Sequence, residues 1–347
     1  MQRNSTSLQA LGPGVGPLTL PAEITGGPGG LGGVFLAVAP YLPAESHLLH
    51  GLELELILRR ESLSDERRSW ILDRVGGALK TLHDLSGEES ALPFRIVSSL
   101  ATRIDRAGRT LFVGPWLFPT EDADRTGELE VARAVASHYF GEKLAVAGPG
   151  SYWTSGMARY AACLAADGWG RAGRDQLRSS RIIYFQVKGQ PLDVPLAATR
   201  ETQTEITLHK GSLVLRTLHL LLGDEVFPAA LAAAFRKAQA GPLTLPELRS
   251  ALERGSGRDL GAFFDQWVEG RGIPVARVER REGAFFVLND GPGQIVFETL
   301  PEAGEEVRIH VLEAGESTRI PAAPGADPRA LIDPEKLALV DWRLAPG

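Results

Sequence analysis

The strongest constraint on the fold is a long stretch of helical periodicity in the middle of the chain. From Glu128 to Glu269, apolar residues recur every three or four positions, the spacing that places them on one face of an α-helix. Residues that end or begin helices, among them Gly168, Gly223 and Asp259, interrupt the pattern. We therefore predict seven helices, at residues 128–144, 152–167, 171–187, 210–222, 224–240, 245–255 and 259–269.

Strand patterns flank this helical region on both sides. Four short strands are predicted before it, at residues 34–39, 52–58, 94–100 and 110–118. Arg106 to Gly108 is predicted to form a turn between the last two, and Ser64 is a candidate N-cap for one further helix. After Pro274, five strand patterns separated by turns predict an antiparallel all-β module, at residues 276–278, 285–288, 294–299, 306–312 and 317–320.

Composition narrows the class of protein. A chain of 347 residues with 44% hydrophobic residues is long enough for two or three domains with a sizeable core. Its formal net charge of −6 argues against nucleic acid or an anionic membrane as the partner. No apolar run is long enough to span a membrane and no signal-peptide pattern is visible, so we expect a soluble protein of unknown compartment.

Two further features of composition bear on organisation. Residues 1–32 are rich in Gly and Pro, which predicts an irregular entry to the chain. The single cysteine, Cys163, lies in an apolar helical pattern and is predicted to be a small core residue, not a nucleophile. Arg outnumbers Lys, and Ala, Gly and Leu are abundant, a bias typical of GC-rich bacterial genomes.

Three stretches carry a resemblance to a known family. They are Val131-Ala-Arg-Ala-Val-Ala-Ser-His-Tyr-Phe-Gly-Glu142, Tyr152-Trp-Thr-Ser-Gly-Met-Ala-Arg-Tyr160 and Leu208-His-Lys-Gly-Ser-Leu-Val-Leu215. In order and spacing they resemble the membrane alanyl aminopeptidase family, gluzincin zinc metallopeptidases with a thermolysin-like catalytic domain. The family has H-E-x-x-H in the first stretch, Asn-Glu-Gly in the second, and Tyr, a variable residue and Lys-Gly in the third.

The resemblance implies a fold class and a division into domains. The expected class is α+β: a thermolysin-like domain, with a small mixed sheet and a mainly helical body, followed by an all-β Ig-like module. After the irregular entry at 1–32, these would occupy residues 33–273 and 274–347. Ile332-Asp-Pro334 resembles the last strand of the family's Ig-like module.

The family's functional positions hold different residues here. The two His ligands of zinc correspond to Arg133 and Ser137, and the Glu that acts as general base corresponds to Ala134. The third ligand, a Glu, corresponds to Ser155, one residue closer along the chain than usual. The Tyr that steadies the oxyanion corresponds to Leu208. The resemblance therefore implies a degenerate member with no catalytic residues, no metal ligands and no cofactor.

Two side-chain groups near these positions have alternative interpretations. His138 and Glu142 could hold a metal as two ligands, but a simple ion pair is the preferred interpretation. Arg133 would repel a divalent cation; it could hold a carboxylate with help from the hydroxyls of Ser137 and Ser155, or pair locally.

Three hypotheses about function follow. The first is an inactive aminopeptidase-like protein, a pseudopeptidase, which binds a peptide or protein partner in the vestigial cleft or serves as a scaffold. The second is a zinc-dependent metallopeptidase with a non-standard site, built from His residues that the sequence does not bring together. The third is a hydrolase that uses Ser155 or Ser137, for which no partner base is visible.

Overall fold

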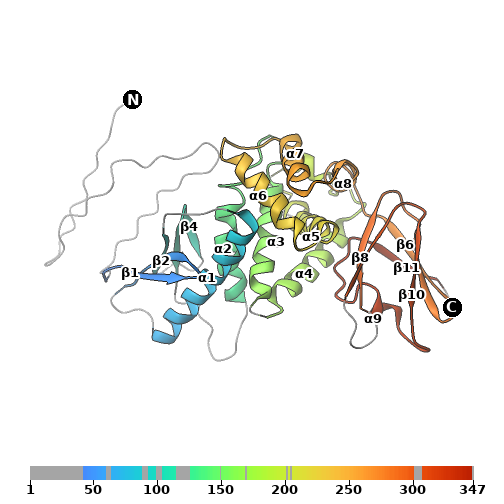
Figure 1. Cartoon of the computed structure of the whole chain (residues 1–347), viewed down its shortest axis with the longest axis horizontal. Helices are drawn as coiled ribbons and strands as arrows, with labels where there is room; N and C mark the ends of the chain where they lie inside the picture. The colour runs from blue at the N-terminus through green and yellow to red at the C-terminus, as the bar shows by residue number, and fades with distance from the viewer. Residues whose placement is uncertain are drawn as a thin grey trace. The chain divides into compact units, whose positions relative to one another are not determined.

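The computed structural model describes residues 42–59, 64–87, 93–98, 104–114, 126–148, 150–168, 170–200, 202–203, 205–300 and 307–345. The predicted irregular entry at 1–32 and the predicted strand at 34–39 lie outside these residues. Within them, a first sheet, a helical body and a second group of strands follow one another in chain order (Figure 1). This is the mixed α+β class that the sequence predicts.

The first sheet is mixed. Its five strands run in the order β1-β2-β3-β5-β4, with bounds Glu45–Leu49 for β1, Leu52–Ile57 for β2, Phe94–Ser98 for β3, Asp105–Ala107 for β4 and Thr110–Val113 for β5. The central three are parallel, and β1 and β4 are antiparallel edges. The sequence did not predict β1, and Arg106, expected in a turn, lies in β4. The turn is made at Gly108, where φ is 54°.

Helix α1 (Asp65–Ser86) connects β2 to β3 and covers the sheet. Its predicted N-cap is confirmed, since the Ser64 side chain accepts a hydrogen bond from the Arg67 backbone N at 3.4 Å. A Cβ on Gly76 would lie 3.2 Å from Leu49 Cδ1, so this glycine lets the helix approach β1 closely.

All seven predicted helices of the body are present. They are α2 (Thr126–Tyr139), α3 (Trp153–Asp167), α4 (Ala172–Val187), α5 (Gly211–Leu222), α6 (Val226–Ala238), α7 (Leu245–Ser256) and α8 (Gly261–Trp267). The predicted end of the first at residue 144 is wrong: α2 ends at Tyr139, and the chain turns at Gly141, where φ is 116°. A short 3₁₀ turn (η2, Leu196–Ala198) and a π-helix (η3, Glu205–Lys210), neither of them predicted, precede α5. None of the described helices combines the length and apolarity needed to cross a bilayer.

The C-terminal part is built mainly of strands around a second apolar core. Its elements are β6 (Val275–Arg281), β7 (Ala284–Asn289), β8 (Ile295–Thr299), β9 (Arg308–Leu312), β10 (Ser317–Pro321), the short helix α9 (Pro328–Leu331) and β11 (Asp341–Leu344). They form a four-stranded sheet, β10-β7-β6-β11, and a two-stranded sheet, β8-β9.

Two expectations for this part are wrong. The module is not wholly antiparallel, because β11 pairs parallel to β6. The last strand is β11 and not Ile332 to Pro334; Ile332 makes only an isolated bridge with Thr299. The sequence missed β11 because a run of only four residues, Asp341 to Leu344, is too short for its alternation to stand out. The proposed boundary between residues 273 and 274 stays a prediction.

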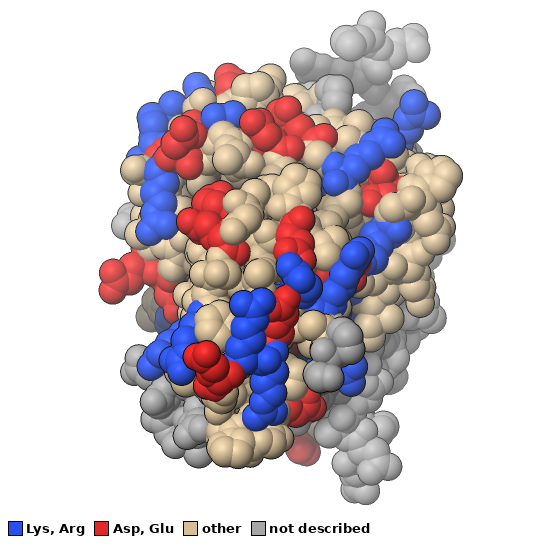
Figure 2. Space-filling model, turned by 90° about the vertical axis from the view of Figure 1, so that its right-hand side faces the viewer, with Lys and Arg blue, Asp and Glu red and all other residues tan. Residues whose placement is uncertain are grey.

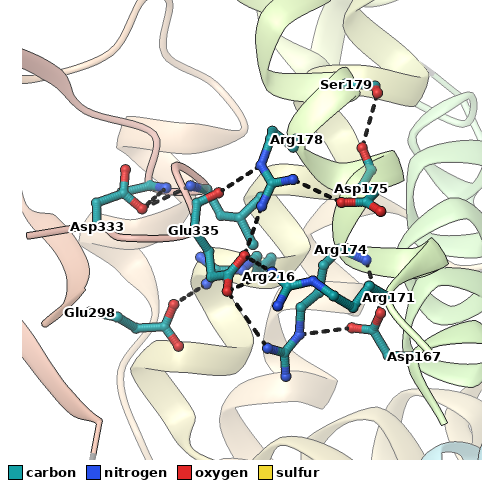
Figure 3. Close-up of polar contacts among 12 residues, drawn as sticks. Asp167, Arg171, Arg174, Asp175, Arg178, Ser179, Arg216, Glu298, Asp333 and Glu335 are labelled. Atoms are coloured by element: carbon teal, nitrogen blue, oxygen red, sulfur yellow. Dashed lines mark hydrogen bonds and ion pairs between the residues drawn. The ribbon is translucent and has the colours of Figure 1, made fainter. Parts of the chain in front are cut away.

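A polar cluster joins the helical body to the C-terminal part (Figure 3). The Glu335 carboxylate lies 2.8 Å from guanidinium nitrogens of both Arg171, the N-cap of α4, and Arg178, within the same helix. Arg216 on α5 pairs with Glu298 on β8. On the face that carries the C-terminal strands, basic and acidic side chains are interspersed (Figure 2). Contacts between opposite charges therefore contribute to holding the two parts together.

Candidate functional site

Helix α2 presents two of its replaced positions, Arg133 and Ser137, on the side that faces away from its core contacts. Val131, Val135 and Ala136 are fully buried, whereas Arg133 is exposed and Ser137 is half-buried. Ala134 is half-buried and packs against the core. This division follows from helical geometry, because residues three or four positions apart share one face. The positions where the family has its two His ligands therefore lie on the accessible face of α2.

Arg133 and Ser137 are both engaged within their own helix. The Arg133 guanidinium lies 2.7 Å from the Glu130 carboxylate, and half of the arginine side chain stays exposed. The Ser137 hydroxyl is 2.8 Å from the carbonyl oxygen of Arg133 and 3.1 Å from that of Ala134, so it donates back to the helix. The local ion pair foreseen for Arg133 is present.

Helix α3 supplies the third replaced position. Ser155 is exposed near the start of the helix, which packs against α2. Its neighbour Gly156 is buried at a contact with the start of α5, where a Cβ would lie 2.3 Å from Thr207 O and 2.8 Å from Gly211 Cα. One turn after Ser155, Arg159 is half-buried on the same helix face.

Leu208 lies in the π-helix η3 and is half-buried. Its alkyl side chain has no hydrogen-bond donor, so it offers nothing to an oxyanion. The adjacent Lys-Gly pair has a packing role. Lys210 is fully buried, donates from Nζ to Gly270 O at 3.2 Å and lies 3.9 Å from Asp193 Oδ1. Burial lowers the pKa of Lys210 to about 8, although the negative charge of Asp193 acts to raise it.

His138 and Glu142 lie within hydrogen-bonding distance of each other. His138 Nδ1 lies 2.9 Å from Glu142, and Arg106 on β4 pairs with the same carboxylate. Burial raises the pKa of Glu142, but the hydrogen bond with His138 and the Arg106 charge outweigh it, and the pKa is lowered. Because α2 ends at Tyr139, Glu142 lies beyond the helix. The predicted pairing is confirmed, although only His138 belongs to the helix.

The residues present do not fit a zinc ion. Zinc in proteins takes Cys, His, Asp or Glu ligands, and the positions that correspond to the family's ligands hold Arg133, Ser137 and Ser155. Across the described residues, no three side chains of those ligand types come together as a possible metal site. Other histidines are tied to different groups: His209 to Ser180, His219 to Tyr160 and His310 to Thr299.

The described residues also give no support to a serine nucleophile at the predicted positions. Ser137 is bonded to its own helix. A Ser–His contact does exist between Ser180 and His209, at 3.2 Å, but Ser180 is fully buried and no substrate could reach its hydroxyl. Cys163 is buried as predicted, and burial raises the pKa of its thiol to about 12.

Sequence reasoning missed one residue of this site, Arg159. The Nε atom of Arg159 has no solvent exposure and no hydrogen-bond partner. The signal was present in the sequence, because Arg159 follows Ser155 by four positions and must share its helix face. Arg133 on α2 and Arg159 on α3 thus bring two guanidinium groups to this pair of packed helices.

The known proteins to which the chain is similar, by sequence or by fold, are aminopeptidases. No family model matches the chain. Aminopeptidase N of Streptomyces lividans is 34% identical over 133 residues, 38% of this chain and 14% of that protein. Aminopeptidase M1 of Arabidopsis thaliana is 25% identical over 185 residues, 47% of this chain and 20% of that protein. Aminopeptidase N of Lactococcus lactis subsp. lactis is 39% identical over 74 residues, 21% of this chain and 9% of that protein.

Among solved structures, the crystal structure of Legionella pneumophila aminopeptidase A in complex with aspartic acid shares the fold. The TM-score is 0.60 at 16% identity, and the match covers 88% of this chain and 38% of that chain. The chain therefore spans a fifth or less of the length of these curated relatives and under half of the structural one. By sequence over part of its length and by fold over most of it, the chain is a relative of the aminopeptidase N/M1 family.

Proposed function

We propose that the chain is a catalytically inactive aminopeptidase-like protein, a pseudopeptidase, which binds a peptide or protein segment. The observation that carries this proposal is the content of the replaced site. Arg133, Ala134, Ser137 and Ser155 provide neither a zinc ligand nor a general base, and Leu208 has no hydrogen-bond donor at the position of the family's Tyr. A nucleophilic water has no activating group among them.

Retention of the framework supports a role that needs the fold. Gly156 and Gly211 allow α3 to cross the start of α5, and Lys210 joins η3 to Asp193 and Gly270. These residues belong to the stretches that resemble the family, and each has a packing role that is independent of zinc. A chain that keeps the packing residues and replaces the metal-binding and catalytic residues is suited to binding or assembly.

The edge of the first sheet supports peptide binding in particular. β4 is the last strand in the sheet order, and edge strands pair readily with an added extended segment. Arg106 on β4 donates to Ser137 O at 3.4 Å and pairs with Glu142, which ties this edge to the end of α2. A peptide added along β4 would therefore run beside the accessible face that carries Arg133.

Hydrolysis of aminoacyl p-nitroanilides tests the proposal. We expect no rate above background, with or without added Zn²⁺, and no change in thermal midpoint on addition of a chelator. Hydrolysis that a chelator abolishes would overturn the proposal and favour the alternative, a zinc-dependent aminopeptidase with a non-standard site. The net charge of −6 disfavours nucleic acid as a partner.

A further inference from the structure

Arg159 is a cation whose guanidinium is partly shielded from solvent. It lies on α3 and is half-buried, and its Nε is shielded from solvent with no hydrogen-bond acceptor. Within the part of the chain that the structure describes, no hydrogen bond or ion pair satisfies its guanidinium. Burial lowers the pKa of Arg159, and the like charge of Arg133 adds to this effect. Arginine nevertheless stays protonated at neutral pH, so the charge remains.

The charges near Arg159 do not balance. The charged side chains that act on it are Arg133, which opposes its protonation, and Glu130, which favours it. Glu130 already pairs with Arg133 at 2.7 Å, so one carboxylate serves two guanidinium groups. His209 adds no positive charge, because burial and the charge of Arg159 lower its pKa to about 4. Arg133, Arg159 and Glu130 together therefore carry one net positive charge.

We infer that Arg159 and Arg133 form a binding site for a carboxylate group of a peptide. This inference rests on the proposed binding function and names the chemistry that the site recognises. A planar guanidinium binds a carboxylate through two parallel hydrogen bonds. The exposed hydroxyl of Ser155, one turn before Arg159, is the nearest additional donor along that helix face. The carboxylate supplies the negative charge that the cluster lacks.

Partial burial makes this site more selective than a surface arginine. An exposed ion pair contributes little because water and salt screen it. A shielded guanidinium has already lost part of its hydration, and a carboxylate replaces that loss with charge-assisted hydrogen bonds. The site should therefore discriminate strongly between a charged and an uncharged peptide of the same length.

Three probe peptides separate the two sources of a carboxylate. The first is pentaalanine with an acetylated N-terminus and a free C-terminus, the second is capped at both ends with a central glutamate, and the third is capped pentaalanine. Binding is measured by titration calorimetry on the wild-type chain. We expect the first or the second to bind at least about tenfold more tightly than the third, a difference of about 1.4 kcal/mol. Whichever binds identifies a terminal or a side-chain carboxylate.

Variants of Arg133 and Arg159 test whether these two residues cause the preference for a charged peptide. Arg159→Gln and Arg133→Gln should each weaken the preferred peptide by about tenfold or more, while leaving the uncharged peptide unchanged. Arg254→Gln is the matched control, because Arg254 is an exposed arginine near the end of α7, and it should change neither. Arg133 is exposed, so its variant carries the test if Arg159→Gln fails to fold.

The experiments distinguish failure of the carboxylate site from failure of the proposed function. Equal binding of all three peptides, no binding of any, or unchanged affinity in both variants would overturn the carboxylate site while leaving the absence of catalysis standing. Chelator-sensitive hydrolysis by the wild-type chain would instead overturn the proposed function itself.

Discussion

Gly156 on α3 and Gly211 at the start of α5 meet at a distance that excludes a side chain: a Cβ on Gly156 would lie 2.8 Å from Gly211 Cα. The same Cβ would lie 2.3 Å from Thr207 O in the π-helix that leads into α5. Both partners are backbone, so neither can swing aside. The crossing fixes α3, and with it Ser155 and Arg159, relative to η3.

The Gly156→Ala variant should therefore be strongly destabilised. Overpacking against backbone typically costs about 1–3 kcal/mol and sometimes more, and we expect at least about 2 kcal/mol of unfolding free energy to be lost. Urea denaturation measures the change. Ser155→Ala, one residue earlier and exposed, is the control and should stay within about 0.5 kcal/mol. Equal stability of the two variants would contradict the close crossing.

The buried Lys210 predicts a pH dependence of stability. Burial lowers its pKa from 10.5 to about 8 in the folded chain. Between these values the unfolded chain binds more protons at this position than the folded one, so its contribution to unfolding free energy rises with pH. That contribution is present above the unfolded pKa and is lost as the pH falls through the folded one.

Comparison with Lys210→Met isolates this effect, because the methionine does not titrate. The difference in unfolding free energy, wild type minus variant, should rise by about 1–3 kcal/mol from pH 7.5 to 10.5, at about 1.36 kcal/mol per pKa unit. Urea denaturation at a series of pH values gives the curve. A flat or falling difference would show that the pKa of Lys210 is not lowered.

Arg159→Met should be neutral or stabilising in the absence of ligand. Methionine keeps much of the apolar volume and removes a shielded charge without a partner, which can raise unfolding free energy by up to about 2 kcal/mol. Arg178→Met is the contrast, because its guanidinium contacts Asp175 and Glu335, and it should lose about 1 kcal/mol. The measurement is urea denaturation in a buffer free of carboxylate. A loss above about 1 kcal/mol for Arg159→Met would mean that this arginine stabilises the fold.

Glu335→Gln should weaken the link between the helical body and the C-terminal part. The change leaves Arg171 and Arg178 side by side without their shared carboxylate. We expect a loss of about 1 kcal/mol at low salt that fades toward zero near 1 M salt, where screening acts over about 3 Å. Asp84→Asn removes an isolated exposed pair with Lys80 and should cost under about 0.5 kcal/mol. A salt-independent loss at Glu335 would point to packing instead of charge.

The helices could be predicted from the sequence because their signals are local. The apolar spacing of Ile71, Val75, Leu79 and Leu82 and the cap at Ser64 lie within a few turns of one another. The π-helix η3 has no periodic signature of its own, and β4 is three residues long, so neither could be predicted. β11 pairs with β6 across more than sixty residues, and a sequence pattern does not encode such a partner.

The candidate site could be predicted only by position. The resemblance located Arg133, Ser137 and Ser155, and local pairing of Arg133 was one of two interpretations. The structure identifies the partner as Glu130, three residues earlier. That Arg159 has no partner could not be predicted, because it depends on which atoms surround its guanidinium in the fold.

A restored variant provides the positive control for the central claim. Arg133→His, Ala134→Glu, Ser137→His and Ser155→Glu together return the family's ligand types to α2 and α3, and Arg159→Met removes the unpaired cation. If the framework keeps the family's arrangement, this variant should retain close to one zinc per chain after dialysis.

Zinc content is the measurement that tests the account most directly. The wild-type chain, purified without a histidine tag, is incubated with Zn²⁺, dialysed and analysed by mass spectrometry beside the restored variant. The account predicts under about 0.1 zinc per chain for the wild type, because its site offers no ligand that holds zinc. A wild-type value near one zinc per chain would contradict the account and would place ligands elsewhere in the chain.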